Sequence, residues 1–170
     1  MTYRTKTYIA ADWDGDKDAI DQLRKWNESN YWALSFVDAH EMTQARDSSL
    51  NCSIKSSLKA RLDSSKTFVL IVGDHTNNLT AGSCQYCGSY NRVTHFCARI
   101  RHVDYKSFIQ YECDVAVGSP MKIIVLYKSL IADKKKCPEA LRDIGLHIPM
   151  LIKRGEHYYW NYEEVKKAFE

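Results

Sequence analysis

The sequence predicts an α/β fold, a three-layer sandwich in which helices cover both faces of a five-stranded parallel sheet. Short runs rich in β-branched and aromatic residues alternate along the chain with segments of helical periodicity. Two of the short runs are apolar almost throughout, which is typical of parallel strands, because both of their faces are buried. The 170 residues, 45% of them apolar and 26% charged, fit one domain spanning 1–170 and exclude a disordered chain.

Three strands and two helices are expected in the first half of the chain. Thr7–Ala11 is the first strand, and apolar residues at helical spacing follow it over Ala19–Trp26. Trp32–Val37 is the second strand. Leu50–Leu62 has an apolar residue at every fourth position, which predicts a helix. Thr67–Val72 is the third strand and reads as buried on both faces.

The second half completes the expected sheet. Lys122–Tyr127 is a second buried strand, and Pro138–Gly145 has the punctuation of a short helix, with Pro at its start and Gly at its end. Ile148–Ile152 supplies the fifth strand, and Tyr162–Phe169 is a last helix with Asn161 in a variant capping box. Strands joined by helical crossovers in this way predict a flavodoxin-like sheet of order 2-1-3-4-5.

The carboxyl ends of the expected strands define the predicted site. In a flavodoxin-like sheet, ligands bind beyond these ends, near the point where the strand order reverses. Asp12 and Asp38 follow the first and second strands, and Gly73 and Asp74 follow the third. Residues 75–105 break the alternation as a long, loop-like, Cys-rich insert that is expected to overhang the same edge. These four residues are therefore predicted to bind a substrate.

An acidic residue interrupts the apolar face of the helix expected after this insert. At 3.6 residues per turn, Glu112 lies between Phe108 and Val115, whereas Asp114 falls on the far side as an ordinary solvated acid. Burying a carboxylate costs several kcal/mol unless it is paired or its pKa rises. Glu112 is therefore either an active-site acid or the partner of a nearby Lys or Arg.

Four short stretches of the chain resemble a known family. Ser107–Glu112, followed by the strand Lys122–Tyr127, is similar to the "W-V-x-[WY]-E-I" helix and "I-I-x-[IV]" strand of bacterial TIR-like domains of the Thoeris ThsB type. Upstream, Leu58–Leu62 and Phe68–Gly73 resemble the "S-x-V-x-x-V-L-I-G" segment of the same family. The resemblance covers roughly residues 6–130.

The resemblance implies a flavodoxin-like TIR fold and a role in antiviral signalling. It also implies NAD as substrate, cleaved at its nicotinamide–ribose bond to give an ADP-ribose-derived signal. The family's catalytic glutamate falls on Glu112, and Tyr111 is the aromatic residue beside it, a candidate for substrate binding. A carboxylate suits this reaction because it can stabilise the positive charge that develops on the ribose.

The insert also carries residue types that bind zinc. Cys84 and Cys87 form a C-x2-C pair, and His95 and Cys97 follow within ten residues, so that four ligands stand at zinc-compatible spacing. Cys113, on the next helix, could replace one of the last two. A structural zinc ion would explain how a long loop stays ordered. Reduced thiols and a surface histidine are the alternative interpretation.

Composition and charge bear on partners and location. Six cysteines without a secretory signal favour the cytoplasm, where thiols stay reduced. No apolar run approaches the roughly 18 residues of a membrane span, so no membrane partner is expected. A net charge of +3 is too small to predict nucleic-acid binding. The expected partners are a nucleotide, and a second copy of the chain or a separate effector protein.

Two other functions fit the same fold. The first is a non-catalytic module that signals through docking surfaces. The second is a phospho-acceptor receiver domain, which would use Asp12 and Asp14 after the first strand, Asp74 as acceptor and Lys153 after the fifth strand. Release of nicotinamide from NAD distinguishes the enzyme from both.

Overall fold

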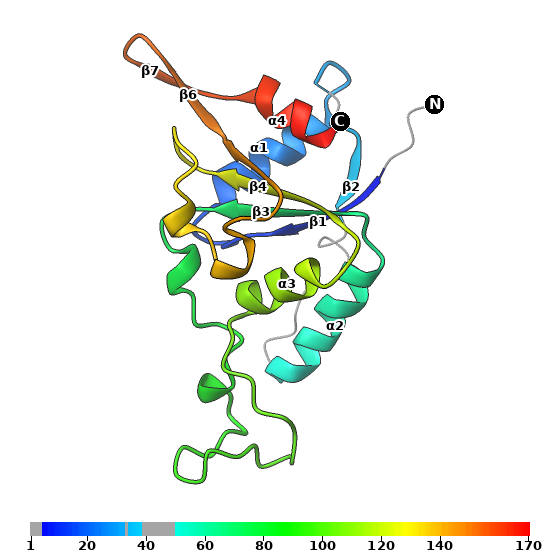
Figure 1. Ribbon diagram of the computed structural model, residues 1–170, viewed down its shortest axis with the longest axis vertical. Coiled ribbons are helices and arrows are strands. Elements are labelled where there is room, and N and C mark those ends of the chain that lie inside the picture. Colours follow the sequence, from blue (N-terminus) through cyan, green and yellow to red (C-terminus); the bar gives the residue numbers. More distant parts are fainter. Residues whose placement is uncertain (1–4, 33, 39–49) are drawn as a thin grey trace.

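The structure is a computed structural model, and it describes residues 5–32, 34–38 and 50–170. A parallel sheet lies at its centre (Figure 1), with the order β2-β1-β3-β4-β5. This order confirms the predicted flavodoxin-like arrangement. The strands are β1 (Thr5–Ala10), β2 (Phe36–Asp38), β3 (Thr67–Val72), β4 (Lys122–Tyr127) and β5 (Leu146–Pro149).

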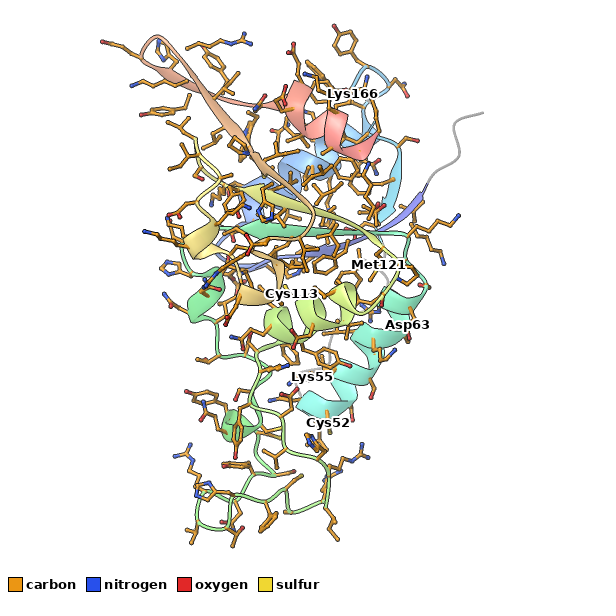
Figure 2. All side chains as sticks on the ribbon, in the orientation of Figure 1. Cys52, Lys55, Asp63, Cys113, Met121 and Lys166 are labelled. Carbon is orange, nitrogen blue, oxygen red and sulfur yellow. The ribbon has the colours of Figure 1, made fainter. Side chains whose placement is uncertain are left out.

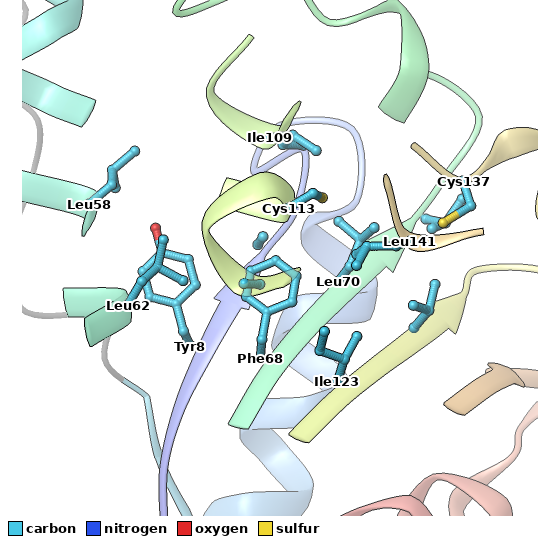
Figure 3. Packing of buried hydrophobic residues seen from close by; sticks show 14 of the residues in the cluster. Tyr8, Leu58, Leu62, Phe68, Leu70, Ile109, Cys113, Ile123, Cys137 and Leu141 are labelled. Carbon is cyan, nitrogen blue, oxygen red and sulfur yellow. The ribbon is translucent and has the colours of Figure 1, made fainter. Parts of the chain in front are cut away.

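Helices cover both faces of the sheet and make two separate hydrophobic cores. Figure 1 shows α1 (Lys17–Glu28) and α4 (Tyr162–Phe169) on one face, and α2 (Asn51–Asp63) and α3 (Phe108–Val117) on the other. Because side chains alternate along a strand, neighbouring residues enter opposite cores. Ile9 packs towards α1 and α4, whereas Tyr8 packs towards α2 and α3. Figure 3 shows the second of these cores, between the sheet and α2 and α3.

The central strand β3 is buried along its whole length, as its apolar sequence predicts. It pairs with β1 on one side and with β4 on the other. Alternate residues of this six-residue strand therefore pack into the two cores on opposite faces of the sheet.

The predicted fifth strand, Ile148–Ile152, is wrong in its bounds. β5 ends at Pro149, and the next residues form a separate antiparallel hairpin of β6 (Leu151–Arg154) and β7 (His157–Trp160). Met150 divides the apolar run: its N–H donates to the carbonyl of Tyr127 and its carbonyl accepts from the N–H of Asn161. Its buried side chain joins the core on the α1 and α4 face.

Three smaller predictions also need correction. The short helix expected at Pro138–Gly145 is only a 3₁₀ turn, Glu139–Leu141, because the chain then turns sharply at Gly145 (φ +86°) into β5. Asn161 does not cap α4 with its side chain, which instead points its amide at a carbonyl of β5. The second strand is confined to Phe36–Asp38, and Trp32 lies in a turn before it.

The insert between β3 and α3 has little regular structure, as predicted. It contains two three-residue 3₁₀ turns, Thr76–Asn78 and Cys84–Tyr86, and an isolated bridge between Tyr90 and Cys97. Figure 1 shows it projecting from the side of the molecule that carries α2 and α3. In the part of the chain that is described, no helix has the length and apolar character of a membrane span.

Candidate functional site

The predicted catalytic residue Glu112 lies inside the layer formed by α2 and α3. Its helix begins at a capping box, in which Ser107 accepts from the N–H of Gln110 and the Gln110 side chain accepts from the N–H of Ser107. The cap fixes where α3 begins, and the helical period then places Glu112 on the face that packs on the sheet. Only 3% of the residue is exposed.

The hydroxyl of Tyr8 donates a hydrogen bond to Oε1 of Glu112. Figure 3 shows the Tyr8 side chain rising from β1 beside Leu62 of α2, with its hydroxyl directed towards the helical layer. Tyr8 also stacks against Phe68, with 6.0 Å between the ring centroids. The acid is thus held by a hydroxyl that the core keeps in one position, and not by the direct ion pair that was the alternative to a catalytic role.

Burial dominates the acid–base behaviour of this pair. It raises the pKa of Glu112 from 4.5 to about 7, although the hydrogen bond from Tyr8 and the positive charge of Arg61 both lower that pKa. The pKa of the Tyr8 hydroxyl is raised well above its usual value, chiefly by burial and also by the negative charge of Glu112. Glu112 therefore changes its charge near neutral pH, while Tyr8 keeps its proton and stays a donor.

Glu112 and the carboxyl edge of the sheet are separate places in the fold. Tyr8 pairs with Phe68, the second residue of β3, and Gly73 lies five residues further along. At about 3.3 Å per residue, roughly 16 Å of strand separates the level of Tyr8 from Gly73. The residues predicted from strand ends and the residue predicted from the helix pattern thus do not form one compact group.

At the carboxyl edge, Asp12 and Gly73 shape the loops that follow β1 and β3. The carbonyl of Asp12 accepts from the N–H of Asp16, 2.8 Å away, and Gly73 donates its N–H to the hydroxyl of Thr76 at 2.9 Å. A Cβ on Gly73 would lie 2.0 Å from Oδ1 of Asp16, so only glycine fits beside this buried carboxylate. Lys128 balances the negative charge of the loop after β1, since its Nζ lies 2.7 Å from a carboxylate oxygen of Asp18 and 3.6 Å from one of Asp16.

Asp16 is a buried acid that the sequence analysis did not single out. Burial raises its pKa, partly offset by Lys128, and its Oδ2 has no hydrogen-bond partner among the described residues. Acidic residues alternate along the sequence after β1, and this pattern does not indicate that the side chain of Asp16, and not that of Asp12 or Asp14, is the buried one.

The other two strand-end acids are engaged in ion pairs. Asp38, at the end of β2, is buried and pairs with Arg24 of α1 at 3.2 Å. Asp74 has 81% of its side chain exposed and pairs with Lys136 at 2.7 Å, an interaction that lowers its pKa. Lys153, which a receiver domain would need near Asp74, instead lies on the β6–β7 hairpin over the ring of Tyr158. The arrangement of these residues does not favour the receiver interpretation.

Tyr111 lies at the contact between α2 and α3, beside the base of the insert. Nζ of Lys55, on α2, is 5.5 Å from the centre of its ring. The same Nζ donates to Asp104 and to the carbonyl of Lys106, each at 2.8 Å. Lys55 is buried, so this cation fastens the end of the insert to α2 (Figure 2).

The cysteines fall into two groups, and all six are free thiols. Cys113 and Cys137 are buried in the core on the α2 and α3 face. Cys84, Cys87 and Cys97 line a pocket at the base of the insert together with Cys52 and His102, and His95 does not line it. Nδ1 of His95 is instead 3.0 Å from the hydroxyl of Tyr90. Within residues 5–32, 34–38 and 50–170, no three His, Cys, Asp or Glu side chains are grouped so as to hold a metal ion.

A five-stranded parallel sheet of order 2-1-3-4-5 with helices on both faces defines the class of flavodoxin-like α/β domains, which includes TIR-like domains. Residues 8–81 match the family model described as "Thoeris protein ThsB, TIR-like domain". The match covers less than half of the chain, and together with the order of the sheet it supports a TIR-like domain of the Thoeris ThsB type. The matched range runs from β1 through β3 into the insert, and Glu112 follows it. A comparison with curated proteins found no match.

Proposed function

We propose that the protein cleaves NAD at the bond between nicotinamide and ribose, with Glu112 as the carboxylate that stabilises the reacting ribose. The observation that carries the proposal is the Glu112–Tyr8 pair: a buried carboxylate on α3, held by a hydroxyl of β1, which lies in the range that matches the TIR-like family model, and titrating near neutral pH. Acids with such a perturbed pKa are concentrated at functional sites.

The proposed reaction needs little more than one well-placed negative charge. Nicotinamide leaves with the electron pair of the glycosidic bond, and positive charge develops on the ribose. The carboxylate of Glu112 stabilises that charge while Tyr8 fixes its orientation. Water then adds to the ribose carbon and loses a proton, so that NAD and water give ADP-ribose, nicotinamide and a proton. A ribose or adenine group that attacks in place of water would give a cyclic product.

Because Glu112 is buried, the proposed reaction depends on how NAD reaches its carboxylate. With 3% of the residue exposed, a ribose reaches the carboxylate only after α3 or a neighbouring segment shifts. We therefore propose that the resting protein has low activity. Self-association or a partner protein would uncover the acid, and the product would act as a signal to a separate effector.

Free nicotinamide, measured after incubation of the reduced protein with NAD, tests the proposal. The assay is run at pH 7–8 over a range of protein concentrations, because self-association is one proposed route of activation. Release that rises faster than protein concentration is the expected result. Absence of release at every concentration would contradict activation by self-association.

The second candidate is a non-catalytic interaction module of the same fold. Two observations favour it: Glu112 is covered, and the insert presents large apolar side chains to solvent, including Val93, Phe96 and Ile100. In that case Glu112 would serve only the packing of α3 on β1, and NAD would stay intact in the same assay.

A further inference from the structure

We propose that Cys84, Cys87, Cys97 and His102 bind one structural zinc ion at the base of the insert. All four line the same pocket, although the first and last are 18 positions apart in the sequence. Three thiols and one imidazole are one of the ligand sets of structural zinc sites, and the spacing C-x2-C followed by C-x4-H is within the usual range.

The backbone around one of the thiols already positions it as a ligand. Sγ of Cys84 accepts from the N–H of Asp104 at 3.3 Å. Such a donor orients a ligand sulfur, which is the role of the second shell around a metal. The turn that follows Cys97 depends on Ile100 in the left-handed region (φ +56°), a conformation that costs energy unless the surroundings hold it.

The insert has little else to hold it together. Its longest regular elements are three-residue turns, and its large apolar residues face solvent, with Ile100 97% exposed. Chain segments without a core of their own are commonly held by disulfides or a metal. Because all six cysteines are free thiols, a metal is the cross-link available to this insert.

The pocket selects between the candidate ligands. Cys113 is buried in the core beneath α3 and does not line the pocket (Figure 2), and the ring of His95 bonds Tyr90. His102 therefore takes the place that the H-x-C spacing suggested for His95. Cys52, on α2, also lines the pocket but is not needed, because the insert alone supplies four ligands.

The ligand atoms do not converge on one point in the described part of the chain. Each thiol reaches a new position by rotation about a single side-chain bond, and metal binding itself commonly orders the loops that supply the ligands. The proposal concerns the metal-bound state of side chains that already surround one pocket.

The first test uses the intact protein, purified under reducing conditions without added metal. We expect elemental analysis to find one zinc per chain. After removal of zinc by a chelator, Co²⁺ should give the absorption of a tetrahedral site with three thiolates, and proteases should cut the insert faster while α/β circular dichroism is retained. Absence of zinc together with absence of a tetrahedral cobalt spectrum would overturn the proposal.

The second test assigns the ligands. Cys84→Ser, Cys87→Ser, Cys97→Ser and His102→Ala should each weaken cobalt binding by more than about 100-fold, since even second-shell changes cost 10- to 100-fold. His95→Ala and Cys52→Ser are the matched controls and should leave the affinity within about threefold. Strong loss in either control, with binding retained in His102→Ala, would overturn the ligand set.

Discussion

The hydroxyl of Tyr8 on β1 donates to the carboxylate of Glu112 on α3, across 104 positions of sequence. The pair ties the first strand to the helix that follows the insert, and both groups are buried. Removal of either group affects stability and, under the proposed function, the orientation of the reacting carboxylate. Changes at these two positions are therefore the most informative ones.

Tyr8→Phe should destabilise the protein by about 1–3 kcal/mol at pH 8, because a buried carboxylate loses its donor. At pH 5 Glu112 carries a proton, so the cost should be smaller. Urea unfolding at both pH values measures this difference. Tyr86→Phe, on an exposed ring of the insert, is the control and should change stability by less than about 0.5 kcal/mol. Equal losses at the two pH values would contradict the assigned role of Tyr8.

Glu112 should make stability fall as the pH rises. The folded pKa of about 7 lies above the ordinary value of 4.5, so the folded state binds more protons between these two values. The contribution of Glu112 to stability is then highest below pH 4.5 and falls until about pH 7, by about 3 kcal/mol. Glu112→Gln should remove this part of the pH dependence, which a comparison of unfolding free energies from pH 4.5 to 8 would reveal. Parallel curves for the two proteins would show that Glu112 titrates normally.

Gly73→Ala should cost about 1–3 kcal/mol, because the new methyl group would meet the buried carboxylate of Asp16. Gly88→Ala, in the insert, is the matched control, since nothing lies within 4 Å of its added Cβ. Thermal unfolding of the two variants checks the prediction. If Gly73→Ala is as stable as Gly88→Ala, the loops after β1 and β3 are not packed as described.

Lys55→Met should loosen the base of the insert, since Asp104 and the carbonyl of Lys106 lose their shared donor. We expect faster proteolysis within the insert and a loss of about 1–2 kcal/mol in stability. Lys59→Met, which removes an exposed ion pair with Asp63 one turn away, should change stability by less than about 0.5 kcal/mol. An unchanged digestion pattern for Lys55→Met would contradict this role.

The sheet could be predicted because its central strands are recognisable from short, largely apolar stretches of sequence. β3 and β4 are continuous apolar runs, and their bounds match the sequence prediction. The division at Met150 could not be predicted in this way, because it depends on hydrogen bonds to Tyr127 and Asn161, which belong to other elements. The β6–β7 hairpin was missed for the same reason.

The candidate site was predicted in part. The helical pattern correctly placed Glu112 on the packed face of α3, but nothing in the sequence indicated Tyr8 as its partner, since Tyr8 reads as an ordinary residue of a buried strand. The expectation that ligands bind at the carboxyl ends of the strands selected Asp12 and Asp74, which are loop and surface residues. It did not select the buried Asp16. Local spacing likewise favoured His95 over His102, because only the fold shows which histidine lines the pocket.

The central claim, that Glu112 acts on NAD, is tested most directly by nicotinamide release from Glu112→Gln and Asp114→Asn under the conditions in which the wild type is active. Both variants remove one charge from α3, but Asp114 is at the surface, paired with Lys106. Loss of one transition-state contact typically costs 10²- to 10³-fold in rate. We predict such a loss for Glu112→Gln in a protein at least as stable as wild type at pH 8, and near-normal turnover for Asp114→Asn. Normal turnover in folded Glu112→Gln would contradict the assignment.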